Sequence, residues 1–310
     1  MKLAVLFWCY KEPAICEDRV ALIRRRDPET PIYVLYGGDP DQAEAFESRL
    51  APFVQDFYVC REEPPAGAER YADAFRGGTT WKYVYGDVLI AAWQRDRGHA
   101  LEWDTVVVIQ WDMLVFESIE RAFACLRPGE ILFSGLRPLS EVEEAWIWTA
   151  PDRPWQRQLY TDFVQHLRDR YDYDQEPLAC LAIVMAFPRT FLERFAEVER
   201  LDLGFLEYRL PMYAQVFGIP FCREHPFRPW WGAVEPFKPF SALRALPREV
   251  WVATILWNRI RKDGARVFHP FWGKVPRGFF QWSAAFVLSI PKILAAGVRG
   301  RWMRLKKKKG

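Results

Sequence analysis

The sequence predicts an α/β protein: a mostly parallel sheet flanked by helices, followed by a C-terminal amphipathic helical segment. Over residues 3–112, short apolar runs alternate with stretches of helical periodicity, the order typical of a doubly wound parallel sheet. The chain has 310 residues, of which 50% are hydrophobic, so it can bury a large core, which excludes a disordered or collagen-like protein. Residues 241–310 carry 16 basic side chains and two acidic ones, whereas residues 1–240 have an excess of acids, although the net charge is only +3. We therefore expect a main domain over 1–240 and a basic segment over 241–310.

The first 112 residues contain the predicted parallel strands. Apolar and β-branched runs predict four strands with helices between them, and the continuous apolar run of the first predicts a strand buried on both faces. The strands are expected at Leu3–Cys9, Pro31–Tyr36, Asp56–Cys60 and Thr105–Ile109, and the helices at Ala14–Arg26, Gln42–Leu50 and Thr80–Arg95. Ligands of such sheets bind beyond the carboxyl ends of the strands, so the residues that follow each strand are candidates for binding.

The second half is less regular. Its apolar runs and helical periodicities predict two further strands and three helices. The strands are expected at Ile131–Ser134 and Leu181–Phe187, and the helices at Arg153–Tyr171, Phe191–Arg200 and Leu206–Phe217, the last containing Pro211.

The cysteines and the N-terminal residues indicate the cellular compartment in which the protein is expected. The six cysteines are scattered without a Cys-x-x-Cys pair, which argues against a disulfide framework and a zinc knuckle and favours thiols in a reducing compartment. The N-terminal apolar run is short and lacks a small-residue cleavage site, so a first strand fits better than a signal peptide. We expect a cytoplasmic protein.

Asp112 is the strongest single candidate for a metal-binding residue. It follows the predicted strand Thr105–Ile109, where a carboxylate can hold a hard cation such as Mg²⁺ or Mn²⁺ together with substrate phosphates. The alternative is that Asp112 only caps the following turn.

At this point the chain resembles a known family. The first strand followed by Tyr10-Lys11-Glu12-Pro13, and the segment Trp103–Asp112 (WDTVVVIQWD), resemble the GT-A-fold glycosyltransferases of the family-2 type, which use nucleotide-sugar donors. In that family a metal-binding Asp-x-Asp motif follows a central strand; here Gln110 stands in place of the first acid. The resemblance implies that Asp112 binds Mn²⁺ or Mg²⁺. The donor-binding residues are expected to be Tyr10, Lys11, Glu12, Gly37, Gly38, Asp39, Lys82, Gln110 and Trp111.

The resemblance continues on the acceptor side. Cys180–Phe195 resembles the family's strand and helix beside the acceptor, and Leu206–Pro220 resembles the helix that carries an acidic base. The resemblance implies that Glu207 deprotonates the acceptor hydroxyl in an inverting transfer. The alternative is an acid at a helix start, stabilised by the helix dipole or by Arg209.

Basic residues and histidines add further candidates. Lys82 and Arg76 could neutralise a diphosphate, or form a solvated pair. The resemblance makes His225 and His269 candidate metal ligands, because some members use a late histidine; the alternative is a structural role for each.

The basic segment predicts membrane contact. Apolar residues recur every three or four positions from Phe279 to Leu294, and Lys292, Arg299 and Lys306–Lys309 belong to a charged tail. Pro291-Lys292 interrupts the run, so helices lying in the interface of an anionic membrane fit better than a spanning helix. An earlier amphipathic helix is expected from Leu243 to Ile260. The alternative is a packed helix with a solvated tail; nucleic acid is not an expected partner, because no nucleic-acid module is visible.

The sequence thus predicts an inverting, metal-dependent glycosyltransferase at the cytoplasmic face of the membrane, acting on a glycan or lipid-linked acceptor. Two alternatives remain: a nucleotidyltransferase, and a non-catalytic membrane-bound scaffold that binds a nucleotide or a sugar. A nucleotidyltransferase is expected to have a basic, glycine-rich loop after the first strand, whereas Tyr10–Pro13 contains no glycine.

Overall fold

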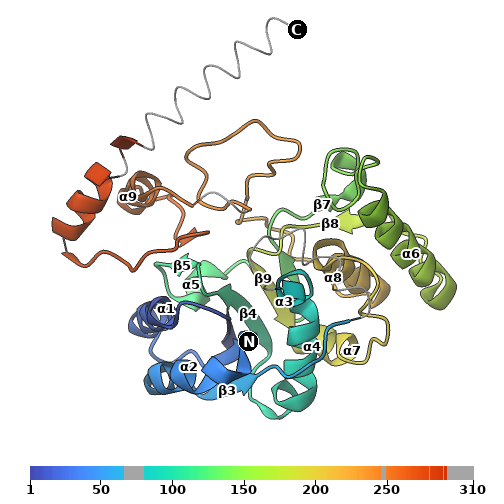
Figure 1. Ribbon diagram of the computed structural model, residues 1–310, viewed down its shortest axis with the longest axis horizontal. Helices are drawn as coiled ribbons and strands as arrows, with labels where there is room; N and C mark the ends of the chain where they lie inside the picture. Colours follow the sequence, from blue (N-terminus) through green and yellow to red (C-terminus); the bar gives the residue numbers. More distant parts are fainter. Residues whose placement is uncertain (66–79, 246–248, 279, 289, 292–310) are drawn as a thin grey trace, which may run out of the picture.

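The structure is a computed structural model that describes residues 1–65, 80–245, 249–278, 280–288 and 290–291 (Figure 1). A central six-stranded sheet has the order β3-β2-β1-β4-β9-β6. Its strands are β1 (Leu3–Cys9), β2 (Ile32–Tyr36), β3 (Asp56–Val59), β4 (Thr105–Gln110), β6 (Leu132–Phe133) and β9 (Met185–Pro188). Two short ribbons pair β10 (Val267–Phe268) with β5 (Leu114–Val115), and β7 (Arg137–Pro138) with β8 (Leu178–Ala179).

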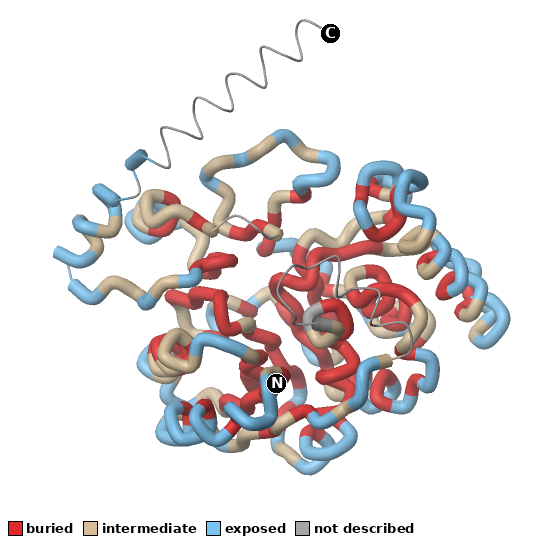
Figure 2. Tube along the Cα trace, viewed as in Figure 1, coloured by how far each residue is buried: buried red, intermediate tan, exposed pale blue. Residues whose placement is uncertain are grey.

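The first four strands of the sheet are parallel, which confirms the predicted fold class. β1 pairs with β2 on one side and with β4 on the other, while β9 runs antiparallel to β4. β1 and β4 are central strands whose apolar side chains are almost all buried (Figure 2), as their unbroken runs of apolar residues predict. The carboxyl ends of β1, β2 and β4 therefore lie along one edge of the sheet.

Helices cover both faces of the sheet. α1 and α2 contact each other on one side, and α4 contacts α7 and α8 on the other (Figure 1). The helices are α1 (Pro13–Arg26), α2 (Ala43–Leu50), α3 (Thr80–Val84), α4 (Gly86–Asp96), α5 (Ile119–Ala122), α6 (Pro154–Tyr171), α7 (Arg189–Phe195), α8 (Leu206–Val216) and α9 (Val252–Ile260).

The helix expected at Thr80–Arg95 is divided in two, so this prediction was wrong at Tyr85. Gly86 packs against the indole of Trp8, and a Cβ atom there would lie 2.2 Å from the Trp8 ring. The chain can approach the strand this closely only at a glycine, and the backbone of Tyr85 leaves the helical region at that point.

The strand expected at Leu181–Phe187 begins only at Met185, because side chains bind the backbone of residues 181–184. The Ser134 hydroxyl donates to Leu181 O (2.6 Å) and accepts from Val184 N (3.1 Å). Since these backbone groups are satisfied by side chains, the segment does not need a strand partner.

Two more element boundaries differ from the predictions. α7 ends at Phe195, five residues before the expected Arg200. α9 starts at Val252, whereas Leu243 lies in a bridge with His269 and accepts a hydrogen bond from Trp230 N (3.0 Å). The predicted helix at Leu206–Phe217 is present as α8 and continues through Pro211.

The segment after residue 240 packs against the main domain. β10 pairs with β5, and Phe271 N donates to the carbonyl oxygen of Asp112 (2.8 Å). The buried guanidinium of Arg19 donates to the carbonyl oxygens of Phe271 and Gly273. The C-terminal segment therefore contributes directly to the region that follows β4. The expected boundary at residue 240 stays a prediction.

Part of the predicted basic tail lies outside the described residues, as do Arg76 and Phe279. Residues 278, 280–288 and 290–291 are helical. In the part of the chain that the structure describes, no helix has both the length and the apolar character needed to cross a membrane.

Candidate active site

The carboxyl ends of β1 and β4 bring several predicted donor-binding residues together. Tyr10 packs edge-on against Trp111, with 6.0 Å between ring centroids. The Lys11 ammonium lies 4.8 Å from the Trp111 ring centroid. An ammonium held over aromatic rings at a strand end is suited to an anionic or aromatic part of a ligand.

The end of β2 joins this edge through two glycines and Lys82. A Cβ atom at Gly38 would lie 2.7 Å from the carbonyl oxygen of Tyr10, so only glycine allows the two loops to approach. Lys82 Nζ, on α3, donates to the carbonyl oxygens of Gly38 (3.3 Å) and Cys60 (3.4 Å). A cation therefore lies beside the loop after β2.

Glu12 and Asp39 flank this edge. Glu12 precedes α1 with φ 58° and ψ 62°, a left-handed backbone that is costly for a side chain other than glycine, asparagine or aspartate. The side chain of Asp39 accepts a hydrogen bond from Asp41 N (3.1 Å) and caps a short helical turn. Both side chains remain exposed to solvent.

Asp112 and His269 form a buried pair at the end of β4. The exposed fractions of the two residues are only 4% each, and His269 Nε2 lies 3.4 Å from Asp112 Oδ1. His269 Nδ1 lies 2.8 Å from the carbonyl oxygen of Arg244, an acceptor, so Nδ1 must carry a proton. In the neutral ring Nε2 then presents a lone pair to a carboxylate oxygen that has no hydrogen-bond partner among the described residues.

Two electron-pair donors that face each other need a proton or a cation between them. A carboxylate oxygen and an imidazole nitrogen are both ligands for Mn²⁺ and Mg²⁺, with carboxylate preferred by Mg²⁺, so this pair fits the predicted metal. Among the described residues, no group of three or more His, Cys, Asp or Glu side chains is arranged around a common point. Among these four residue types the described residues therefore offer a cation only Asp112 and His269 at this place. His225, the other predicted ligand, is exposed.

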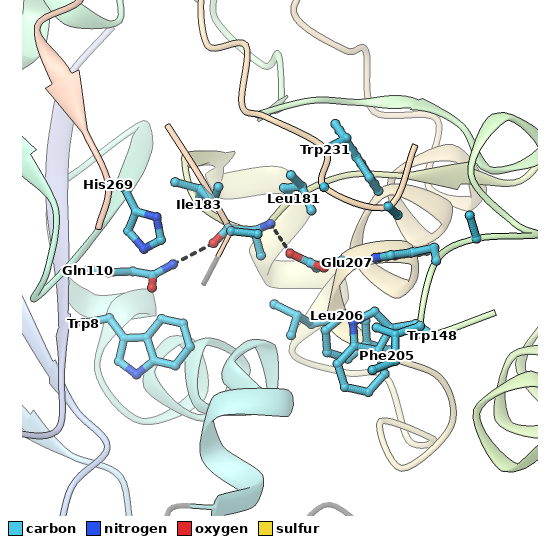
Figure 3. Close-up of a pocket in the computed structure, with 17 residues that line it drawn as sticks. Trp8, Gln110, Trp148, Leu181, Ile183, Phe205, Leu206, Glu207, Trp231 and His269 are labelled. Carbon is cyan, nitrogen blue, oxygen red and sulfur yellow. Dashed lines mark hydrogen bonds between the residues drawn. The ribbon is translucent and has the colours of Figure 1, made fainter. Parts of the chain in front are cut away.

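The backbone N–H and C=O groups of Ala182 connect Glu207 to Gln110 (Figure 3). Gln110 Nε2 donates to the carbonyl oxygen of Ala182 (2.6 Å), and Ala182 N donates to Glu207 Oε1 (2.8 Å). In addition, Cys180 N donates to the carbonyl oxygen of Glu207 (2.8 Å). The end of β4 and the first turn of α8 are thus held at a fixed separation, with both side chains on the wall of one cavity.

Glu207 has the electrostatics of a proton acceptor that operates near neutral to weakly basic pH. Burial raises its pKa to about 8, against a smaller opposite effect from the hydrogen bond of Ala182 N. No basic side chain pairs with it among the described residues, and Arg209 binds elsewhere. The predicted alternative of a Glu207–Arg209 pair is therefore wrong, whereas Glu207 does lie in the first turn of α8, as the helix-dipole alternative expects.

Arg209 instead holds the start of α8 in place. It forms a buried two-bonded ion pair with Asp87 of α4, with both N–O distances at 2.6 Å. Its remaining nitrogen donates to the carbonyl oxygens of Leu201 (2.6 Å) and Leu203 (2.7 Å). The loop before α8, and with it the position of Glu207, depends on this ion pair.

The cavity has a volume of about 430 Å³ and is mainly aromatic and aliphatic. Figure 3 shows Trp8, Gln110 and His269 on one side and Glu207, Trp148, Phe205 and Trp231 on the other. The polar or titratable side chains among its described lining residues, apart from the tryptophan N–H groups, are Gln110, Glu207 and His269, and none is lysine or arginine. Asp112 does not line the cavity itself, but its partner His269 does.

The aromatic residues of this cavity were not predicted as site residues. Trp8 lies in a strand whose residues are all apolar, so no alternation of polar and apolar residues showed which side chains face the cavity. The indole N–H of Trp8 has no hydrogen-bond partner among the described residues. The sequence feature that could have indicated this cavity is the pair Trp146 and Trp148, which lie two positions apart outside any helix or strand. Trp231 follows another tryptophan in a segment rich in proline.

Comparisons with known proteins give likenesses in fold at low identity. No protein-family model and no curated protein sequence matches the chain. Among solved structures, the chain is similar to the bifunctional glycosyltransferase WbbM (14% identity, TM-score 0.44), covering 93% of this chain and 49% of that one. It is also similar to the galactosyltransferase LgtC in complex with donor and acceptor sugar analogues (13% identity, TM-score 0.37), covering 63% and 60% respectively.

A third similar structure is glucosyl-3-phosphoglycerate synthase from Mycobacterium tuberculosis in complex with Mn²⁺, uridine diphosphate and glucosyl-3-phosphoglycerate. The identity is 16% and the TM-score 0.29, covering 61% of this chain and 57% of that one. The chain therefore spans about half to three fifths of the length of these structures.

Proposed function

We propose that the protein is an inverting, nucleotide-sugar-dependent glycosyltransferase. The observation that carries the proposal is the Ala182 bridge, which fixes a carboxyl group of raised pKa, Glu207, opposite the end of the strand that carries Gln110 and Asp112. A donor at the sheet edge and an acceptor in the aromatic cavity would then meet between them. The sequence resemblance to GT-A glycosyltransferases supports the same assignment.

In this mechanism Glu207 acts as the general base. As the acceptor oxygen forms a bond to the anomeric carbon, its proton passes to the Glu207 carboxylate, and the bond from that carbon to the phosphate oxygen breaks. Attack from the side opposite the leaving nucleoside diphosphate inverts the anomeric configuration. The Ala182 N–H orients Oε1 of the base, and the apolar wall keeps bulk water from competing with the acceptor.

Asp112 and His269 would hold Mn²⁺ or Mg²⁺. A bound cation would offset the charge that develops on the leaving diphosphate. Lys11 and Lys82 supply positive charge along the same edge without metal.

The cavity favours an uncharged sugar as the group next to the attacking hydroxyl. Tryptophan and phenylalanine faces stack on the apolar faces of sugar rings, and no lysine or arginine is present among the described lining residues to bind a phosphate or carboxylate. We propose that this sugar is the end of a glycan, lipid-linked or free, processed at the cytoplasmic face of the membrane.

A turnover assay with a panel of nucleotide sugars tests the proposal. The purified chain should release nucleoside diphosphate with Mn²⁺ present, and Asp112→Asn and Glu207→Gln should each lower the rate at least 100-fold. Glu197→Gln, an exposed matched control, should leave it unchanged. Full turnover in both site variants would contradict the assignment. Release of pyrophosphate from a nucleoside triphosphate would identify a nucleotidyltransferase, and nucleotide binding without any turnover would identify a scaffold.

A further inference from the structure

Four arginines gather around a second cavity, away from the candidate active site. The cavity has a volume of about 390 Å³ and lies between the end of α1, α9 and the segment that carries Val275–Gly278 and Trp282. Its basic lining residues are Arg25, Arg26, Arg259 and Arg277, and no acidic residue is among the described residues that line it.

Few carboxylates lie close enough to neutralise the charges of these arginines. Within the described residues, no carboxylate lies within 4 Å of the guanidinium groups of Arg25, Arg26 or Arg259. Arg277 has one such neighbour, Asp18 at 3.9 Å, but Asp18 already binds Arg19 at 2.7 Å. Burial, and then the charges of Arg26 and Arg266, lower the pKa of Arg259. Several cations held together in this way form a site for an anion.

Aromatic side chains hold one of the arginines in place. The Arg259 guanidinium lies 4.7 Å from the Phe116 ring centroid and 5.2 Å from that of Trp282. Phe116 is buried beneath it, and Trp282 joins the same cluster from the C-terminal helix. Because a stacked guanidinium keeps its edge free, it can still donate two parallel hydrogen bonds to phosphate oxygens.

The two segments that contribute Trp282 and Arg259 to the arginine cavity also carry exposed apolar side chains. Residues 278–291 contain no charged side chain, and within the helical residues 280–288 the side chains of Phe280, Val287 and Leu288 are 60% to 86% exposed. Trp257 and Ile260 of α9 are also exposed, at 55% and 75%. In Figure 1 the helical residues 280–288 and α9 project from the side of the molecule that carries α1, and Figure 2 shows most of 280–288 and the end of α9 as exposed.

We propose that the arginine cavity binds the phosphate headgroup of an anionic membrane lipid while the helical residues 280–288 lie in the membrane interface. Apolar side chains beside the cavity would enter the acyl boundary, which places the guanidinium groups at headgroup depth. A soluble phosphate or a nucleic acid would match the charge but would leave the exposed phenylalanine, valine and leucine side chains in water. The proposal is independent of the proposed transferase reaction.

Vesicle binding by the full chain tests the headgroup site. The protein should bind phosphatidylcholine vesicles that contain phosphatidylglycerol much more tightly than phosphatidylcholine alone. The double variant Arg26→Gln/Arg259→Gln should weaken binding to the anionic vesicles by about 30-fold, since each basic residue near such a surface contributes roughly fivefold. Arg168→Gln/Arg170→Gln, which removes two exposed arginines from α6, should change it less than threefold.

A second variant separates a phosphate site from general attraction between charges. Arg26→Lys/Arg259→Lys keeps the charge but loses the planar, stacked donors, so it should still lose most of the effect. Equal binding by this variant and the wild type would overturn the proposal, as would equal binding by the glutamine variant. Tight binding of inorganic phosphate without vesicles, or of a single-stranded oligonucleotide through the same arginines, would identify a different ligand. Unchanged thermal unfolding of the variants serves as the folding control.

Discussion

The two walls of the candidate active site are built by different means. The donor edge consists of the carboxyl ends of β1, β2 and β4, whose position follows from the parallel pairing of apolar strands. The acceptor wall consists of residues 181–184 and the first turn of α8, which side chains hold in place through hydrogen bonds to backbone groups. A regular sheet thus fixes the proposed donor edge, and a network of side-chain bonds fixes the proposed acceptor wall.

The largest expected effect lies on the acceptor wall. Glu207→Gln keeps the shape of the side chain but removes the proton acceptor, so kcat for transfer should fall by about 10²- to 10⁴-fold while the KM for the donor changes little. Steady-state kinetics with donor and acceptor varied separately measures both effects. A comparable loss of donor affinity would show that the two walls are not separate in function.

The pH dependence of the wild type sharpens this prediction. Because burial raises the Glu207 pKa to about 8, the base is mostly protonated at pH 7, and kcat/KM should rise with pH until it levels off above pH 8. The folded state binds this proton more tightly than the unfolded state, so Glu207 also makes the free energy of unfolding fall as pH rises from about 4.5 to about 8. Both dependences should be absent in Glu207→Gln, and their persistence would assign them to another group.

The second expected effect concerns the ion pair beneath the acceptor wall. Arg209→Leu leaves the carboxylate of Asp87 buried without its partner, which should lower the free energy of unfolding by about 3–5 kcal/mol. Chemical denaturation measures the loss. Arg200→Leu, which removes a more exposed pair with Asp202, should cost less than about 1 kcal/mol. Equal losses in the two variants would mean that the buried pair does not hold α8.

The contrast between the walls also explains what the sequence could predict. The strands β1, β2 and β4, and therefore the location of Tyr10, Gly38 and Asp112, follow from apolar runs and parallel topology. The alignment of Gln110, Ala182 and Glu207 depends on contacts between residues 25 and 72 positions apart, which local periodicity does not report. The resemblance named Gln110 and Glu207 separately, but the backbone of Ala182, which joins them, became visible only in the structure.

A third effect tests the donor edge alone. In Gly38→Ala the added Cβ atom would lie 2.7 Å from the carbonyl oxygen of Tyr10, so the loops after β1 and β2 must separate. We expect the KM for the donor to rise about tenfold, with the KM for the acceptor unchanged, and a loss of stability of about 1–3 kcal/mol. Gly273→Ala is the control, because its Cβ would meet nothing closer than 3.7 Å. A larger change in the acceptor KM would contradict the division between the walls.

The smallest expected effect lies in the irregular segment itself. Ser134→Ala removes the hydroxyl that donates to Leu181 O and accepts from Val184 N, and both groups are buried away from water. The free energy of unfolding should fall by about 1–3 kcal/mol, since two backbone groups lose their partner. Ser140→Ala, whose hydroxyl bonds an exposed Glu176 carboxylate, should cost less than about 1 kcal/mol. If residues 181–184 contact the acceptor, Ser134→Ala should also raise the KM for the acceptor and leave the KM for the donor unchanged. A loss of stability without that kinetic change would mean that Gln110 and Glu207 hold Ala182 in place without help from Ser134.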